Sequence, residues 1–151
     1  MPASYLSQGD VEAISSPYLQ QRSRYESWRI RWIRIDGDTL EAAIDMTATH
    51  DSPTDPGGFH LTSFSVEEFA AQFMIIYAHH WAGLNRKMRE GWMVESAVKA
   101  VKVIRRTRDI RVSMRVRRIR KRGENIYCQA DYRVTDADGG LFEIMLKGFL
   151  S

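Results

Sequence analysis

The chain has 151 residues, of which 44% are hydrophobic, with a single cysteine and a formal net charge of +3. This length and hydrophobic content predict one globular domain over residues 1–151 with one core. A lone cysteine excludes an intramolecular disulfide and a cysteine-rich zinc site. Together with an N-terminus that lacks a basic, apolar leader, it indicates a cytoplasmic protein. We expect no metal and no cofactor.

The first third of the chain predicts a short helix followed by a hairpin. Residues 10–14 suit a helix that ends near Ser16, because a residue before proline disfavours the helical conformation. Apolar and charged residues then alternate from Trp28, and they do so again from Leu40 to Met46, on either side of the turn at 36–38. Alternation with a period of two is typical of strands, so these residues predict two strands of a β-hairpin.

A long helix is predicted after the loop at 47–58, from about Val66 to Gly83. Ser65 and Glu68 have the spacing of a capping box, and Phe64 and Phe69 flank it like a hydrophobic staple. Apolar residues cover most of the helix circumference, which predicts a helix that the rest of the protein surrounds. Its polar interruptions and its length exclude a membrane span.

Four long strands are predicted in the last 60 residues, over 92–105, 109–120, 125–135 and 141–150, and their order predicts a meander with reversals at 121–124 and 136–140. The whole pattern is α+β: one antiparallel sheet of about six strands wrapped around one long central helix, which is the hotdog arrangement. An open sandwich with the helix on one face is the alternative, but such a helix would need a polar side.

The start of the long helix resembles a known family. His60-Leu61-Thr62-Ser63 followed by Gln72, together with Ser16-Pro17-Tyr18, resembles the FcoT-like long-chain acyl-CoA thioesterases of the hotdog fold. The residues that match the family pattern are Tyr18, His60 and Gln72. The residues that depart from it are Thr54, where the family has tyrosine, and Thr62 and Ala71, where it has asparagine.

Chemistry at a helix start agrees with this resemblance. Attack on a thioester carbonyl creates an oxyanion, which unpaired amides and the helix dipole stabilise. His60, just upstream, can accept a proton at neutral pH, and Glu67 or Glu68 on the helix is an alternative base. The candidate catalytic residues are therefore His60 and Thr62. The candidate substrate-binding residues are Tyr18, Thr54, Ser63, Phe69, Gln72, Phe73, Arg115 and Arg117, with the acyl chain beside Phe69, Phe73 and Met74.

These features predict a homodimer or higher homo-oligomer that hydrolyses an acyl thioester of coenzyme A or of an acyl carrier protein. Conjugate addition, hydration, dehydration or isomerisation of an unsaturated acyl thioester, and acyl binding without catalysis, remain alternatives. The rival class is a nucleic-acid binding module, because residues 99–122 contain twelve Lys or Arg residues and one acid. Base stacking uses aromatic residues interleaved with the cations, and their absence from this run disfavours nucleic acid as a partner.

Overall fold

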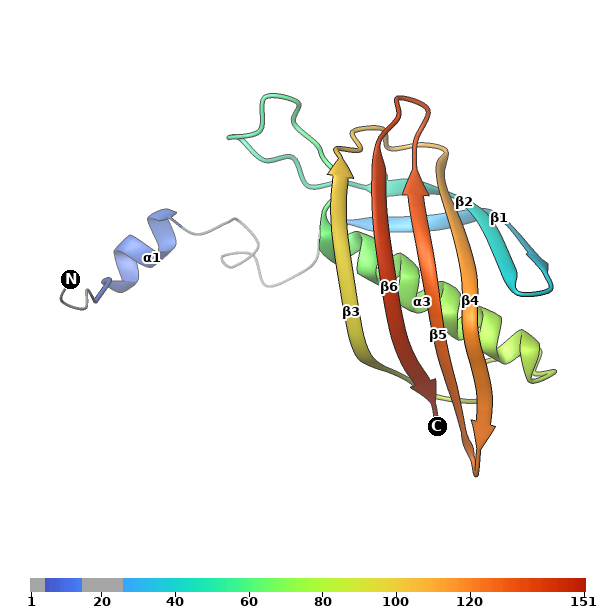
Figure 1. Ribbon diagram of the computed structural model, residues 1–151. Coiled ribbons are helices and arrows are strands. Elements are labelled where there is room, and N and C mark those ends of the chain that lie inside the picture. Colours follow the sequence, from blue (N-terminus) through green and yellow to red (C-terminus); the bar gives the residue numbers. More distant parts are fainter. Residues whose placement is uncertain (1–4, 15–25) are drawn as a thin grey trace.

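The computed structural model describes residues 5–14 and 26–151 (Figure 1), so the segment 16–18 with its candidate Tyr18 lies outside the described residues. The elements are α1 (Gln8–Ile14), β1 (Ser27–Asp36), β2 (Thr39–Ala48), α3 (Ser63–Trp81), β3 (Gly91–Lys102), β4 (Ile110–Arg122), β5 (Asn125–Thr135) and β6 (Leu141–Leu150). The predicted α+β hotdog architecture is confirmed: a six-stranded antiparallel sheet packs on the long helix α3.

The strands lie in the order β1-β2-β4-β5-β6-β3, and every neighbouring pair is antiparallel. The predicted hairpin and the β4-β5-β6 meander are confirmed. The prediction that β3 is the first strand of that meander is wrong, because β3 pairs with β6. Short reversals force β4, β5 and β6 to be neighbours, whereas the connection at 103–109 is long enough to cross the end of the sheet. Strands β1 and β3 are therefore its two edges.

Helix α3 lies across the concave face of the sheet (Figure 1) and is buried around most of its circumference. Phe69 and Phe73 are fully buried, and the indole of Trp28 packs edge-on against Phe69 with ring centroids 4.8 Å apart. Two hydroxyls bond to backbone carbonyls: Tyr132 donates to Ala70 on the helix (2.9 Å), and Tyr77 donates from the helix to Gly37 (2.7 Å). None of the helices in the described part of the chain has the length and hydropathy that a bilayer crossing requires.

The start of α3 differs from the prediction. The N-cap is Thr62, whose side chain accepts from the amide of Ser65 (3.3 Å), so the helix begins three residues earlier than predicted. The predicted capping box is wrong, because the Ser65 hydroxyl donates to Glu26 (2.5 Å) and the Glu68 carboxylate accepts from the Trp28 indole (2.7 Å). Glu26 and Trp28 thus bind the side chains of Ser65 and Glu68 in place of the helix backbone amides that a capping box would use. The predicted staple is also wrong, since Phe64 is 65% exposed.

We expect Phe73→Ala to lower the free energy of unfolding by about 3–5 kcal/mol, because a surrounded helix leaves a cavity that cannot collapse. Chemical denaturation of the wild type and the variant measures the loss. Phe64→Ala, which removes an exposed ring of the same helix, is the matched control and should change stability by no more than about 0.5 kcal/mol. A loss below about 1 kcal/mol for Phe73→Ala would mean that the helix is docked on one side only.

Candidate functional site

The loop of residues 49–62, which leads into α3, is fixed to the sheet at its end. Phe59 and Leu61 are buried, and the amide of Leu61 donates to the carbonyl of Ile104 (2.8 Å), just beyond β3. His60 stands between these two anchors and its side chain is 46% exposed. The anchors therefore hold the imidazole at the surface, three residues before the first residue of α3.

The imidazole of His60 pairs with a carboxylate of the same loop. Its Nδ1 lies 2.6 Å from Oδ2 of Asp55, whose side chain is only 9% exposed. The Asp55 carboxylate also accepts from the guanidinium of Arg105 (2.9 and 3.1 Å) and from the amide of Gly57 (3.0 Å). The hydrogen bond to His60, followed by the bonds from Gly57 and Arg105, lowers the pKa of Asp55 from 3.8 to about 2.

An ionised carboxylate only accepts hydrogen bonds, so Nδ1 of His60 carries the proton in this pair. In the neutral imidazole the other nitrogen, Nε2, is then a free base, and it makes no hydrogen bond to any of the described residues. Arg105 keeps the carboxylate in place from the far side, and it also donates to the carbonyl of Phe59 (3.1 Å). The arrangement is an imidazole oriented by an aspartate, the geometry that a general base requires.

Gly57 makes this arrangement possible. A Cβ at residue 57 would lie 2.1 Å from Nη1 of Arg105, so only glycine allows the guanidinium to lie against the loop and reach Asp55. Neither Asp55 nor Arg105 is predicted as a site residue from the sequence. The spacing of Asp55 five residues before His60 within a Pro-Gly-Gly turn is a signal for the first; no local signal exists for Arg105, which is 50 residues from its partner.

The first turn of α3 follows this pair directly along the chain. Thr62 uses its hydroxyl as the N-cap, and its carbonyl accepts from the amide of Val66 (3.1 Å). Within the described residues the amides of Ser63 and Phe64 have no backbone partner. They point out of the positive end of a 19-residue helix, which is a favourable place for a developing negative charge.

The two helix carboxylates considered as alternative bases are engaged by the edge strands. Glu67 accepts from the hydroxyl of Ser96 on β3 (2.9 Å), and Glu68 accepts from the indole of Trp28 on β1 (2.7 Å). Each therefore joins one side of the helix to a strand. His60 has no such structural bond at Nε2 among the described residues, which favours it as the base.

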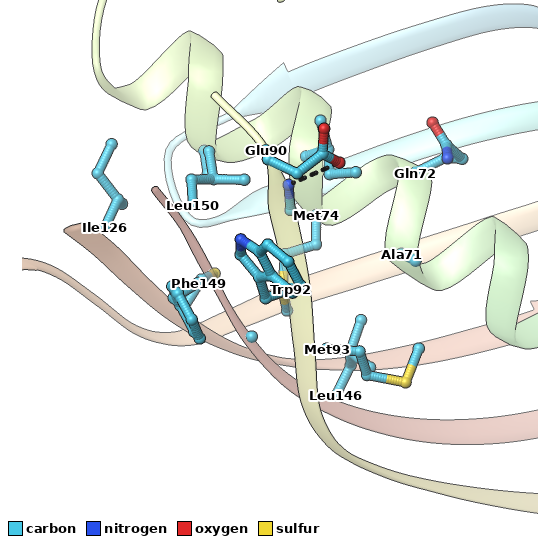
Figure 2. A pocket seen from close by; sticks show the side chains of 15 residues that line it. Ala71, Gln72, Met74, Glu90, Trp92, Met93, Ile126, Leu146, Phe149 and Leu150 are labelled. Carbon is cyan, nitrogen blue, oxygen red and sulfur yellow. Dashed lines mark hydrogen bonds between the residues drawn. The ribbon is translucent and has the colours of Figure 1, made fainter. Parts of the chain in front are cut away.

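A cavity of about 240 Å³ lies further along α3, between the helix and the inner faces of β3, β5 and β6 (Figure 2). Its apolar lining includes Ala71, Met74, Ile75, Ala78, Ile126 and Leu146, and Gln72 and Glu90 are its polar residues. Two glycines allow close approaches beside the cavity: a Cβ at 91 on β3 would lie 2.8 Å from Ile75 of α3, and one at 148 on β6 would lie 2.7 Å from the carbonyl of Trp92 on β3. The cavity begins at Ala71, about 12 Å along the helix from Ser63.

The structure brings some of the predicted site residues together and separates others. His60, Thr62 and Ser63 lie at or just before the start of α3. Thr54 lies earlier in the loop, and its hydroxyl bonds only to Ser52 (3.1 Å) among the described residues. Gln72 is exposed on α3 and lines the cavity with Met74. Phe69 and Phe73 have no exposed surface and belong to the core.

Arg115 and Arg117, the two arginines expected to meet the carrier of the thioester, lie on the outer face of β4. Both are near carboxylates: Arg115 lies 3.7 Å from Asp38, and Arg117 lies 2.5 Å from Asp131. Their charges are therefore largely compensated within the chain.

No known family profile matches the sequence, and no curated protein matches it. The fold, however, is similar to solved structures. A conserved protein of Pseudomonas aeruginosa is 12% identical, with 91% of this chain and 95% of that chain covered and a TM-score of 0.57. A mutant thioesterase of Staphylococcus aureus is 10% identical (82% and 93% covered, TM-score 0.53), and a mutant thioesterase of Pseudomonas aeruginosa is 17% identical (80% and 80%, TM-score 0.50). The chain therefore has a hotdog fold similar to that of thioesterases.

We expect the stability that Asp55 contributes to depend on pH. Its pKa in the fold, about 2, is below the ordinary 3.8, so ionised Asp55 stabilises the fold above about pH 4, and this contribution is lost as the pH falls through about 2. The difference in Tm between wild type and Asp55→Asn should therefore be present near pH 6 and vanish by about pH 2. Asp51→Asn, a carboxyl of the same loop with no bond to His60 or Arg105, is the matched control. A difference that does not change with pH would contradict the assignment.

Proposed function

We propose that this protein is an acyl thioesterase of the FcoT-like kind, which hydrolyses a long-chain acyl thioester of coenzyme A or of an acyl carrier protein. The observation that carries the proposal is the Asp55–His60 pair, which presents a free Nε2 directly before the N-terminus of α3. The similarity of the fold to thioesterase structures supports it.

In the proposed reaction, Nε2 of His60 takes a proton from a water molecule whose oxygen attacks the thioester carbonyl carbon. Asp55 accepts from Nδ1–H and stabilises the imidazolium that forms. The amides of Ser63 and Phe64 and the helix dipole stabilise the tetrahedral oxyanion. When the intermediate collapses, the carbon–sulfur bond breaks and the imidazolium returns its proton to the thiolate, so the products are a carboxylic acid and a free thiol.

The cavity position supports a long acyl chain. A carbonyl at the start of α3 is about 12 Å from the cavity, and an extended chain spans about 1.2 Å per bond, so about ten bonds are needed to reach it. The acyl chain would follow the uncovered side of the helix past Gln72. Its tail would fill a space larger than the ~150 Å³ cavities that bind benzene. Short acyl groups would not reach this apolar space.

We also propose that the active form is a homodimer joined along β3. This edge strand is 12 residues long, and its large apolar residues Met93, Val94 and Val101 are each about half exposed or more. A long, apolar, unpaired edge binds other chains unless it is covered. A second copy of β3 would satisfy its backbone groups and cover the exposed side of α3.

Thiol release from acetyl, octanoyl and palmitoyl thioesters of coenzyme A tests the reaction. We expect palmitoyl to be preferred, and His60→Ala to lower kcat by roughly 100-fold to 10,000-fold, the usual range for loss of a general base, with little change in KM. Asp55→Asn should lower kcat as well, because the imidazole loses its orientation. His80→Ala removes an exposed histidine at the end of α3 and should have no effect. Equal rates for His60→Ala and wild type on all three substrates would refute the proposal.

Light scattering tests the dimer. The wild type should have twice the 17.5 kDa mass of the chain. Val94→Lys, which places a charge on the β3 edge, should shift the protein toward the monomer. Ile30→Lys places the same charge on the opposite edge, β1, and should leave the mass unchanged. A monomeric wild type, or equal effects of the two variants, would exclude a dimer along β3.

A further inference from the structure

The outer, convex face of the sheet carries a row of aromatic side chains that the sequence does not reveal. Strand pairing places Tyr127 of β5 opposite Phe149 of β6, and Phe149 opposite Trp92 of β3. The Tyr127 and Phe149 ring centroids are 5.4 Å apart, and those of Phe149 and Trp92 are 6.4 Å apart with a 20° angle between their planes. Trp92 is 54% exposed, and the other two rings are half-buried.

Arginines of β4 continue this row. The strand has an irregular register between Val116 and Arg118, after which Arg118 pairs with Gln129 and Arg120 pairs with Tyr127. Residues directly opposite on neighbouring strands share a face, so both arginines lie on the outer face with the aromatic row. Arg120 therefore extends the line of Tyr127, Phe149 and Trp92 by one strand.

The charge at this end of β4 is uncompensated. The exposed cations are Arg118, Arg120, Lys121 and Arg122, and none has an ion pair within the described residues. By contrast, the earlier arginines of the strand have acidic partners, as Arg111 has in Asp109 (2.8 Å). The neighbouring carboxylates are also engaged: Glu95 with Lys147 (3.2 Å), and Glu124 with Arg89. The face thus combines flat aromatic groups with free positive charge.

We propose that this surface, Trp92, Phe149, Tyr127, Arg118 and Arg120, binds single-stranded nucleic acid. Bases stack on aromatic side chains, and phosphates bind arginines that lie alongside; a sheet face with two or three such rings is a recurring platform for single strands. Aromatic residues are absent from the basic run at 99–122, but the neighbouring strands supply them. The interleaving of rings and cations therefore occurs across the sheet instead of along the chain.

The aromatic row lies away from His60, although Trp92 and Phe149 also border the cavity proposed for the acyl tail. β3 begins and β6 ends at the end of the sheet opposite to the loop before α3 (Figure 1), so a thioester held at His60 would not place its own carrier on this row. Figure 2 shows Trp92 and Phe149 side by side where the strands border the cavity. A dimer along β3 would use the strand's backbone edge and would leave the outer face open. The inference does not depend on the proposed hydrolysis.

Fluorescence anisotropy of a labelled single strand of about 12 nucleotides, titrated at about 50 mM salt, tests the proposal. We expect Trp92→Ala and Tyr127→Ala each to weaken binding by roughly 5-fold to 100-fold, with Trp92→Phe close to wild type. Arg118→Gln with Arg120→Gln should weaken binding and reduce the slope of log K against log salt by about 1.4, because each phosphate that an arginine no longer neutralises lowers it by about 0.7. Trp32→Ala, on the edge strand β1, and Arg111→Gln, at the start of β4 and far along that strand from Arg118, are the matched controls and should bind like wild type.

Any of the following results would overturn the proposal: no binding at about 50 mM salt; equal binding of duplex; loss of affinity in the arginine variants alone, which would indicate charge without stacking; or tighter binding of vesicles that contain anionic lipid. Displacement of the labelled strand by adenosine 3′,5′-diphosphate, at the same concentration as the strand needed for binding, would also overturn the proposal. It would indicate a site for a mononucleotide. His60→Ala should bind the strand normally, so failure of the proposed hydrolysis and failure of this inference are distinguishable.

Discussion

The burial of Phe69 and Phe73 of α3 against a single curved sheet is the constraint from which the rest of the structure follows. A helix this apolar is stable only when strands cover most of it, and the sheet has to curve to do so. The same burial determines where each possible site lies. The N-terminus of α3 emerges beside the loop that carries His60, and the incompletely filled space at its middle forms the apolar cavity.

The loop before α3 shows how few groups are needed to orient an imidazole. Buried Phe59 and Leu61 fix the backbone on both sides of His60, and Asp55 then orients the ring. Asp55 is itself held by Arg105, which arrives from the chain after β3. The imidazole lies at the surface, but two sets of contacts fix it to the sheet. One is the buried backbone on either side of it, and the other is the ion pair of Asp55 with Arg105.

Local patterns predicted those parts of the fold that depend on local physics. Alternation gave the strands, and apolar residues around the circumference gave the helix, because burial on one or more sides imposes those periods. Predictions failed where a distant group decided the outcome. Ser65 and Glu68 have the spacing of a capping box, yet Glu26 and Trp28 bind them from about 40 residues away. Likewise, nothing local pairs Arg105 with Asp55 or β3 with β6. The match of His60 to a family pattern located the loop, but not the groups that orient the ring.

Two tyrosines determine how far α3 can move along its own axis. Apolar contacts permit a helix to slide along its axis, because one methyl group can replace another at little cost. A hydrogen bond to a particular carbonyl opposes such sliding, because the bond breaks when the carbonyl moves. Tyr132 reaches from β5 to the carbonyl of Ala70, and Tyr77 reaches from the helix to Gly37 in the β1–β2 turn. A slip of one residue, about 1.5 Å, would break both bonds in the interior. These hydroxyls therefore restrict sliding of α3 along its axis, and with it displacement of the amides at the helix start.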